Sequence, residues 1–215
     1  MSNSYLFRKI HSLLGIVPVG AFLIMHLISN YAATKGHGAF VEKVLWINSL
    51  PLVFFLELLF IWLPLTYHAV YGLYVAYTAR HNAINYGYFR NQMFLWQRIT
   101  GVVTFLFVAW HVFETRVQVA LGNIDHQGLG VAMHDIFANP IYLTIYVVAV
   151  IMVSFHFCNG IWGFLVSWGL TVGPRAQKVS TIICMLLFVV MSVMFILSIV
   201  SFTGAEFEQI PAGIK

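Results

Sequence analysis

Charged residues are scarce in this sequence. Asp, Glu, Lys and Arg make up 8% of its 215 residues, whereas a typical soluble domain carries about 25%. So few charges cannot cover the surface of a water-soluble domain of this length. Hydrophobic residues reach 60%, which predicts an integral membrane protein in the lipid bilayer. The net charge of +4 is not gathered in a polybasic segment, and the sequence gives no indication of nucleic-acid binding.

Cysteine and long polar loops are also scarce. Cys158 and Cys184 both lie in apolar segments, which favours small buried hydrophobic side chains over a disulfide or a reactive thiol. No small-residue cleavage site closes the first apolar segment, so we expect no cleavable signal peptide. The longest loop, about 118–139, has room for one surface helix, near LGVAMHDIF. We therefore expect any chemistry inside the membrane or on a partner subunit.

Five apolar segments are long enough to cross about 30 Å of hydrocarbon as helices. The sequence therefore predicts an all-α membrane protein with a single transmembrane domain over residues 1–215. Pro18 and Pro64 fall inside predicted helices and are candidate kinks, and Pro140 falls at a favoured helix start. The five predicted helices cover about 11–32, 51–79, 93–117, 140–169 and 177–202.

The charges predict an orientation for this bundle. One face carries seven basic residues and no acidic ones: Arg8, Lys9, Arg80, Arg90, Arg98, Arg175 and Lys178. All seven acidic residues belong to the other half: Glu42, Glu57, Glu114, Asp125, Asp135, Glu206 and Glu208. Because basic loops stay in the cytoplasm, we expect the N-terminus inside the cell and the C-terminus outside.

Four of the nine histidines lie inside predicted helices, one on each of the first four: His26, His68, His111 and His156. A single histidine at such depth is usually bonded to a neighbour or belongs to a pore or proton path. Three others fall in outer loops, where we expect solvated side chains: His37, His126 and His134.

The depths of the four histidines arrange them in two layers. His26 and His111 come about 15 and 18 residues after an inner helix start, which places both in the outer half. His68 and His156 come about 16 residues after an outer helix start, which places both in the inner half. The layers are expected to lie about 15 Å apart.

Two imidazoles at one depth on different helices are the ligand set for a bis-histidine haem, so two layers predict two haems. Gly72 and Gly160 follow the inner histidines by four residues, on the same helix face. A missing side chain there suits a flat macrocycle, although small residues also allow close helix packing. A zinc site is less favoured, because two ligands do not complete a tetrahedron.

Several longer stretches carry a family resemblance. They are YLFRKIHSLLGIVPVGAFLIMHL, SLPLVFFLELLFIWLPLTYHAVYG, YFRNQMFLWQRITGVVTFLFVAWHVFETR and FHFCNGIWGFLVSWGLTVGPRAQ. The chain resembles, from about residue 5 to 200, the cytochrome b558 anchor subunits of succinate:menaquinone oxidoreductases (succinate dehydrogenases) of Gram-positive bacteria. The resemblance implies two b haems in a bacterial cytoplasmic membrane protein. It places the axial ligands of the outer haem at His26 and His111 and those of the inner haem at His68 and His156.

The resemblance also implies partners. A flavoprotein subunit with covalent FAD would oxidise succinate, and an iron–sulfur subunit would relay the electrons. Both would dock on the cytoplasmic face. Electrons would then pass through the inner and outer haems to menaquinone.

Charged residues near the outer histidines are candidates for the quinone site. Glu57 lies about 9 Å inside the second helix, where an ionisable group is a functional candidate. It is predicted to protonate the quinone, and the alternative is an ordinary residue at a helix start. Glu114 and Arg116 are candidates to bind the quinone or the haem propionates, or to form an interfacial pair with each other.

A polar group at the inner edge has two possible roles. Its members are His11, Ser12, Gln97 and Arg98, and they are expected to contact the inner haem propionates or the iron–sulfur subunit. Arginine suits a carboxylate because its fork of donors matches the two oxygens. The C-terminal GAEFEQIPAGIK receives no functional prediction.

Two other functional classes stay open on the sequence alone. One is a di-haem cytochrome b of another quinone-linked complex, such as a hydrogenase, formate dehydrogenase or fumarate reductase. The other is a channel or transporter with functional histidines.

Overall fold

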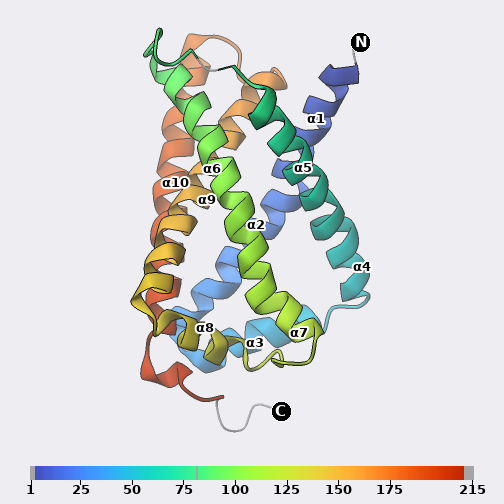
Figure 1. Ribbon diagram of the computed structural model, residues 1–215, viewed down its shortest axis with the longest axis vertical. Coiled ribbons are helices and arrows are strands. Elements are labelled where there is room, and N and C mark those ends of the chain that lie inside the picture. The colour runs from blue at the N-terminus through green and yellow to red at the C-terminus, as the bar shows by residue number, and fades with distance from the viewer. Residues whose placement is uncertain (1–2, 81, 211–215) are drawn as a thin grey trace.

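Five long helices run side by side in the computed structural model, which describes residues 3–80 and 82–210 (Figure 1). No β-strand occurs among the described residues. Five segments are long and apolar enough to cross a membrane: Ser4–Lys35, Val53–Thr78, Phe89–Ala120, Pro140–Ser167 and Pro174–Phe202. The predicted all-α protein with five spans is confirmed.

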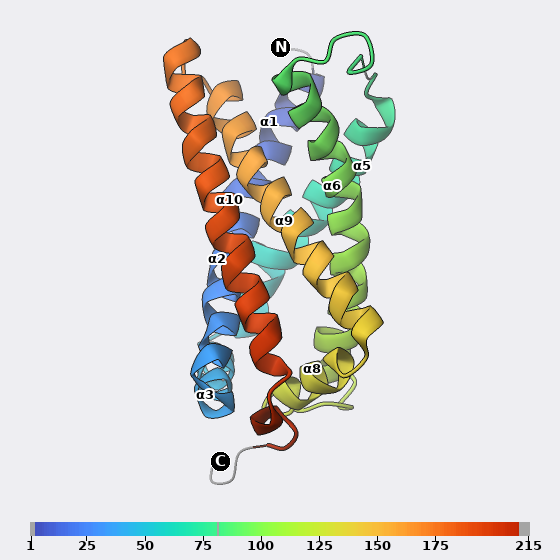
Figure 2. The same ribbon diagram turned by 90° about the vertical axis from the view of Figure 1, so that its left-hand side faces the viewer.

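The two ends of the bundle differ in charge. We call the end that holds the N-terminus and the loops 79–88 and 168–173 the basic end, at the top of Figure 1. The end that holds the short helices α3 and α8 and the C-terminus is the acidic end (Figures 1 and 2).

The first span begins earlier than predicted. It consists of α1 (Asn3–Ile16), α2 (Pro18–Tyr31) and the 3-10 turn η1 (Ala32–Lys35). The prediction that it starts near residue 11 was wrong because Lys9 does not end the helix. Its ammonium group lies 4.6 Å from the centre of the Trp168 ring and donates to the Ser167 carbonyl, as long basic side chains do near a membrane surface.

Prolines interrupt the first and second spans in different ways. The first span has a turn at Val17, directly before Pro18. The second consists of α4 (Val53–Glu57), the π-helical η2 (Leu58–Trp62) and α5 (Leu63–Thr78). Pro64 has no N–H to bond the carbonyl four residues back. Upstream, the Leu63 N–H bonds Leu58, five residues back, and a π turn of this kind absorbs the local mismatch.

The third span also contains a π-helical segment. It consists of α6 (Phe89–Val112), the π-helical η3 (Phe113–Val117) and the short α7 (Gln118–Ala120). The π turn begins two residues after His111 and carries both Glu114 and Arg116.

The last two spans are α9 (Pro140–Ser167) and α10 (Pro174–Phe202). Helix α9 begins with Pro140 after Asn139, whose side chain accepts the Ile141 N–H at 2.9 Å, a strong start signal. These two helices share the most extensive contact in the bundle. Small buried side chains line them, which lets membrane helices approach closely. Examples are Ser154, Cys158, Cys184 and Ser192. Both cysteines are free and buried, as predicted.

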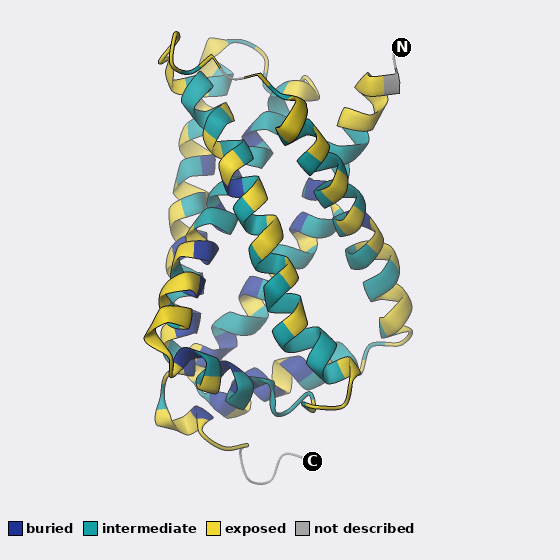
Figure 3. Cartoon of the chain, in the orientation of Figure 1, coloured by how far each residue is buried: buried dark blue, intermediate teal, exposed yellow. Residues whose placement is uncertain are grey.

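Burial is uneven across the bundle. Buried residues concentrate in α9, α10 and the acidic end (Figure 3). In contrast, Pro64 is the only described buried residue of α5, and Thr100 the only one of α6. Many large apolar side chains are more than half exposed and form the surface that lipid would cover. Examples are Leu59, Phe60, Leu106, Ile182 and Leu186.

A small cap closes the acidic end. It consists of α3 (His37–Asn48), α8 (Leu129–Phe137) and the 3-10 turn η4 (Ala205–Phe207). The surface helix α8 was predicted, whereas α3 was not. Phe207 has 0% of its surface exposed and packs on His37 and Phe202, with ring centres 4.6 and 4.9 Å away. The C-terminal segment, which received no functional prediction, therefore contributes to the core through Phe207.

The prediction that His37 and His134 are solvated loop residues was wrong. His37 is 3% exposed, and its Nδ1 lies 3.1 Å from the Glu206 carbonyl. His134 is half-buried, and its Nδ1 lies 2.9 Å from the Phe202 carbonyl. Carbonyls at the end of a helix have no partner within it, and these imidazoles bond such carbonyls at and beyond the end of α10. His126 is also half-buried.

Candidate functional site

The four histidines inside the spans form two pairs. His68 of α5 and His156 of α9 lie nearer the basic end and are called the inner pair; their ring centres are 6.2 Å apart, with a 76° angle between the planes. His26 of α2 and His111 of α6 lie nearer the acidic end and are called the outer pair; their ring centres are 5.9 Å apart, with a 71° angle. The same partners were paired from depth in the sequence.

The spacing of both pairs suits one metal ion between two imidazoles. An imidazole nitrogen lies about 2 Å from a metal it binds, so two rings on opposite sides have centres about 6 Å apart. In the described residues, three or more His, Cys, Asp or Glu side chains do not gather at any one metal-binding point. A closed four-ligand zinc site is therefore not formed by these residues, whereas two-ligand haem sites match the donor set.

The rise along helix α9 gives the distance between the two pairs, because α9 contacts both. Its Tyr146 contacts His111 of the outer pair, with ring centres 5.8 Å apart. Its His156 belongs to the inner pair. The ten residues from 146 to 156 correspond to about 15 Å of helix rise.

Backbone carbonyls orient both inner imidazoles. His68 Nδ1 lies 2.9 Å from the His11 carbonyl oxygen, and His156 Nδ1 lies 3.1 Å from the Gln97 carbonyl oxygen. A carbonyl only accepts, so His68 Nδ1 must carry the hydrogen, which leaves the His68 Nε2 lone pair available to a metal. His156 Nδ1 lies 3.1 Å from the Gln97 amide nitrogen as well as from the Gln97 carbonyl. Carbonyl partners of this kind are common behind metal-binding histidines.

Glycines on neighbouring helices make room for the inner rings. A Cβ on Gly15 would lie 2.3 Å from His68 Cε1, and one on Gly101 would lie 2.8 Å from His156 Cε1. Gly72 and Gly160, predicted to face a macrocycle, instead face the side chains of His11 and Gln97. Sequence reasoning missed Gly15 and Gly101 because it searched along each histidine's own helix.

Two members of the polar group predicted at the inner edge, His11 and Gln97, contact the inner pair. The His11 ring stacks on His68 with centres 4.2 Å apart and a 4° angle between the planes. Ser12 accepts the Trp168 indole N–H at 3.1 Å. The Gln97 amide donates to the His156 carbonyl at 2.9 Å. The same amide accepts from Asn159 at 2.7 Å.

Side chains, in contrast, surround the outer pair. His111 Nδ1 lies 3.2 Å from the Tyr146 hydroxyl, and that hydroxyl donates to Glu114 at 3.2 Å. His26 Nε2 lies 3.3 Å from the Asn30 amide nitrogen, which also donates to the His26 carbonyl at 2.8 Å.

Glu57 and Arg116 form an ion pair near the outer pair. Their nearest atoms are 2.8 Å apart, and their side chains are 19% and 38% exposed, respectively. The sequence left open an interfacial pair between Glu114 and Arg116. The structure corrects this, because Glu114 contacts Tyr146 on α9 while Arg116 reaches Glu57 on α4.

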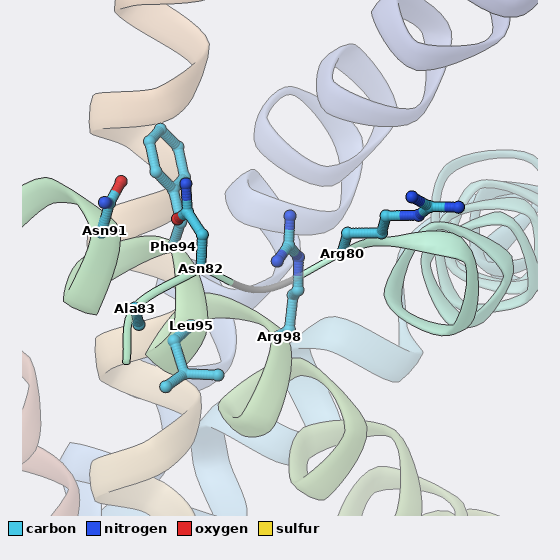
Figure 4. A pocket seen from close by; sticks show the side chains of 7 residues that line it. All are labelled: Arg80, Asn82, Ala83, Asn91, Phe94, Leu95 and Arg98. Carbon is cyan, nitrogen blue, oxygen red and sulfur yellow. The ribbon is translucent and has the colours of Figure 1, made fainter. Parts of the chain in front are cut away.

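Arg98 lies on a separate polar surface at the basic end. It lines a pocket of about 100 Å³ together with Arg80, Asn82 and Asn91. Figure 4 shows the Arg98 side chain extending from α6 toward the segment that carries Arg80 and Asn82. Two guanidinium groups give this pocket the charge that would attract an anion or an acidic protein surface.

Comparison with known proteins identifies the family. The family model of the succinate dehydrogenase/fumarate reductase transmembrane subunit matches residues 82–197, which is more than half of the chain. The chain belongs to this family. The succinate dehydrogenase cytochrome b558 subunit of Bacillus subtilis (strain 168) is 45% identical over 204 residues, covering 94% of this chain and 98% of that protein.

Membership of the succinate dehydrogenase/fumarate reductase transmembrane family excludes most of the alternatives left by the sequence, but the family model itself includes fumarate reductase subunits. It separates the chain from the cytochromes of hydrogenases and formate dehydrogenases and from channels and transporters. With five apolar spans, the protein is a multi-pass protein of the bacterial cytoplasmic membrane.

Proposed function

We propose that this subunit binds two b haems and passes electrons from the catalytic subunits of succinate dehydrogenase to menaquinone. The observation that carries the proposal is the presence of two histidine pairs with ring centres 5.9 and 6.2 Å apart. The name of the Bacillus subtilis relative favours succinate oxidation over fumarate reduction as the working direction.

The four histidines would be the axial ligands. Haem bound between two imidazoles supplies reversible one-electron transfer. The chain itself holds the ligands at two depths about 15 Å apart. At the inner pair, the His11 carbonyl places the hydrogen of His68 on Nδ1, so the His68 Nε2 would be free to bind iron.

The basic end would face the cytoplasm and dock the iron–sulfur subunit, with the FAD-containing flavoprotein bound to that subunit. The positive-inside rule supports this orientation. The pocket of Arg80 and Arg98 supplies positive charge for an acidic partner surface or for the propionates of the inner haem.

The Glu57–Arg116 pair would serve the quinone at the outer level. Reduction of a quinone to a quinol takes two electrons and two protons. Arg116 can donate a further hydrogen bond to a quinone oxygen as negative charge develops there, because its fork holds five donors. Glu57 can pass on a proton, which is the usual work of a carboxylate placed beside a reacting oxygen. Propionate binding by Arg116 is the less favoured role, since Glu57 already occupies this arginine.

A spectrum and one substitution test this function. The purified three-subunit complex is expected to contain two haems per chain, both reduced by succinate. In Glu57→Gln, menaquinone reduction should slow by about 100-fold, the lower range for loss of an acid–base group, while succinate still reduces both haems. Glu42→Gln is the matched control, because Glu42 is an exposed carboxylate at the same end of the bundle.

Two results would count against the proposal. A wild-type complex without haem would refute the ligand assignment of all four histidines. Normal quinone turnover in Glu57→Gln would leave the ligand assignment standing and remove Glu57 from the quinone site.

A further inference from the structure

The outer ligand His111 is the start of a chain of part-buried polar side chains. Its Nδ1 lies 3.2 Å from the Tyr146 hydroxyl, and the hydroxyl donates to a Glu114 carboxylate oxygen at 3.2 Å. The inner imidazoles instead face backbone carbonyls, and His156 also faces the Gln97 amide nitrogen; no carboxylate contact is seen for either among the described residues. The outer ligand is therefore linked, through one phenol, to a carboxylate.

The direction of these bonds determines which nitrogen of His111 is available. The Tyr146 hydroxyl has one hydrogen and donates it to a Glu114 carboxylate oxygen. The Tyr146 oxygen must then accept from His111, which places the hydrogen on Nδ1. The lone pair is left on Nε2, the state needed to bind iron. The opposite direction would put the hydrogen on Nε2 and block binding there.

Aromatic packing keeps the phenol in this position. Tyr146 is 3% exposed. The rings of Phe107 and Phe137 each lie 5.0 Å from its ring, at angles of 86° and 81°. Phe107 also stacks on His111 at 5.8 Å and 15°. Both partners of the His111–Tyr146 bond are therefore held by the same packed cluster, and the hydroxyl group is poorly accessible to water.

The π turn after His111 places the carboxylate. Glu114 belongs to η3, which begins two residues after His111. A π turn changes the direction of the side chains that follow it. Glu114 contacts α9, whereas Arg116 two residues later contacts α4. Two positions apart on a helix, these charged residues face different neighbours.

We infer that Tyr146 is a positioning residue that, with Glu114, sets the tautomer and the electron-donating strength of the outer ligand His111. The inference rests on the proposed function, because it requires His111 to bind haem iron. A hydrogen bond from Nδ1–H to a carboxylate-linked acceptor makes an imidazole a more basic ligand. A more basic ligand stabilises the oxidised iron, so this chain holds the outer potential down.

The test is Tyr146→Phe in the intact three-subunit complex, with redox titration of both haems and their low-spin EPR signals. Phenylalanine keeps the ring packing and removes only the hydroxyl. The outer midpoint potential should rise. The expected rise corresponds to a change of about three- to tenfold in the one-electron equilibrium constant, and a tenfold change equals about 59 mV. The outer EPR signal should change, while the inner potential and signal stay the same. Glu114→Gln should move the outer potential in the same direction.

Tyr142→Phe is the matched control, because Tyr142 lies one helical turn earlier on α9 and is 41% exposed. It should leave both potentials unchanged.

Selective loss of the outer haem in Tyr146→Phe would also support the inference. If that variant does not assemble, Glu114→Gln decides by the same criteria. Unchanged outer potential and signal would overturn the inference while two bound haems leave the proposed function standing. A wild-type complex that binds no haem would overturn both.

Discussion

The inner and outer histidine pairs have nearly the same spacing but are built from different parts. The inner imidazoles bond the backbone carbonyls of His11 and Gln97 and lie against glycines of neighbouring helices. The outer imidazoles contact side chains, namely Tyr146 and Asn30. A π-helical segment begins two residues after His111 at the outer level, and its Arg116 forms the ion pair with Glu57.

This difference in surroundings corresponds to the chemistry that we expect at the inner and at the outer pair. Backbone carbonyls and glycines give fixed geometry, which suits a site that relays electrons, although the His11 imidazole also stacks on His68 there. Hydroxyl and carboxylate groups can donate, accept and exchange protons, and a guanidinium donates hydrogen bonds. That chemistry suits the level where quinone reduction needs protons. We therefore propose that the proton-coupled half of the function occurs at the outer pair.

The strongest way to break the comparison is to remove one ligand from each pair. His156→Ala should eliminate the inner haem and stop reduction of the outer haem by succinate, because the electron path is interrupted. His111→Ala should eliminate only the outer haem and leave the inner one reducible by succinate. Haem content and the reduced α-band, with succinate and then dithionite, measure both effects. Loss of the inner haem in His111→Ala would reverse our assignment of the two levels.

The second test of the comparison concerns the glycines beside the inner imidazoles, Gly15 and Gly101. In Gly15→Ala or Gly101→Ala the new methyl group would displace an inner imidazole. Inner haem affinity should fall by at least about tenfold, within the range for residues behind metal ligands, with the outer haem retained. Haem titration of the purified variants measures this. Gly163→Ala is the control, because a Cβ there meets no atom within 4 Å. Equal loss from both levels would mean general misfolding rather than a local effect.

The cap should matter mainly to the outer level. Phe207→Ala removes a fully buried ring from between α3 and α8 and should cost about 3 kcal/mol of stability. On heating in detergent, the variant should release the outer haem at a lower temperature than the inner one. Glu208→Ala, at an exposed neighbour, should behave like the wild type. Simultaneous release of both haems would show that the cap stabilises the whole bundle instead.

The smallest effect is expected at Asn30. Its amide lies 3.3 Å from His26 Nε2 and competes for the lone pair that a metal would use. Asn30→Ala should therefore retain the outer haem, with an affinity that rises by no more than about fivefold, equivalent to about 1 kcal/mol for one hydrogen bond. Haem titration of the purified variant measures this affinity. A weaker outer site would identify Asn30 as a support for His26 rather than a competitor.

Most of the bundle could be predicted because lipid imposes strong rules on sequence. The length of each apolar segment and the rise per residue located the five spans. The start of the first helix was predicted too late, near residue 11. The basic side chain of Lys9 lies along the surface and does not end that helix. The cap escaped prediction because α3 and Phe207 are buried by contacts with each other and with α8, which no single segment reveals.

By itself, the sequence determined the spans and their charge asymmetry. It also determined the depth of the four histidines, because depth follows from counting along one helix. Only the tertiary structure decided what surrounds each imidazole. Most groups that contact an imidazole come from a different helix than the histidine itself. They are Gly15, Gly101, the carbonyls of His11 and Gln97, and Tyr146. The rotation of neighbouring helices sets such contacts, and the π turns after Glu57 and His111 alter that rotation locally.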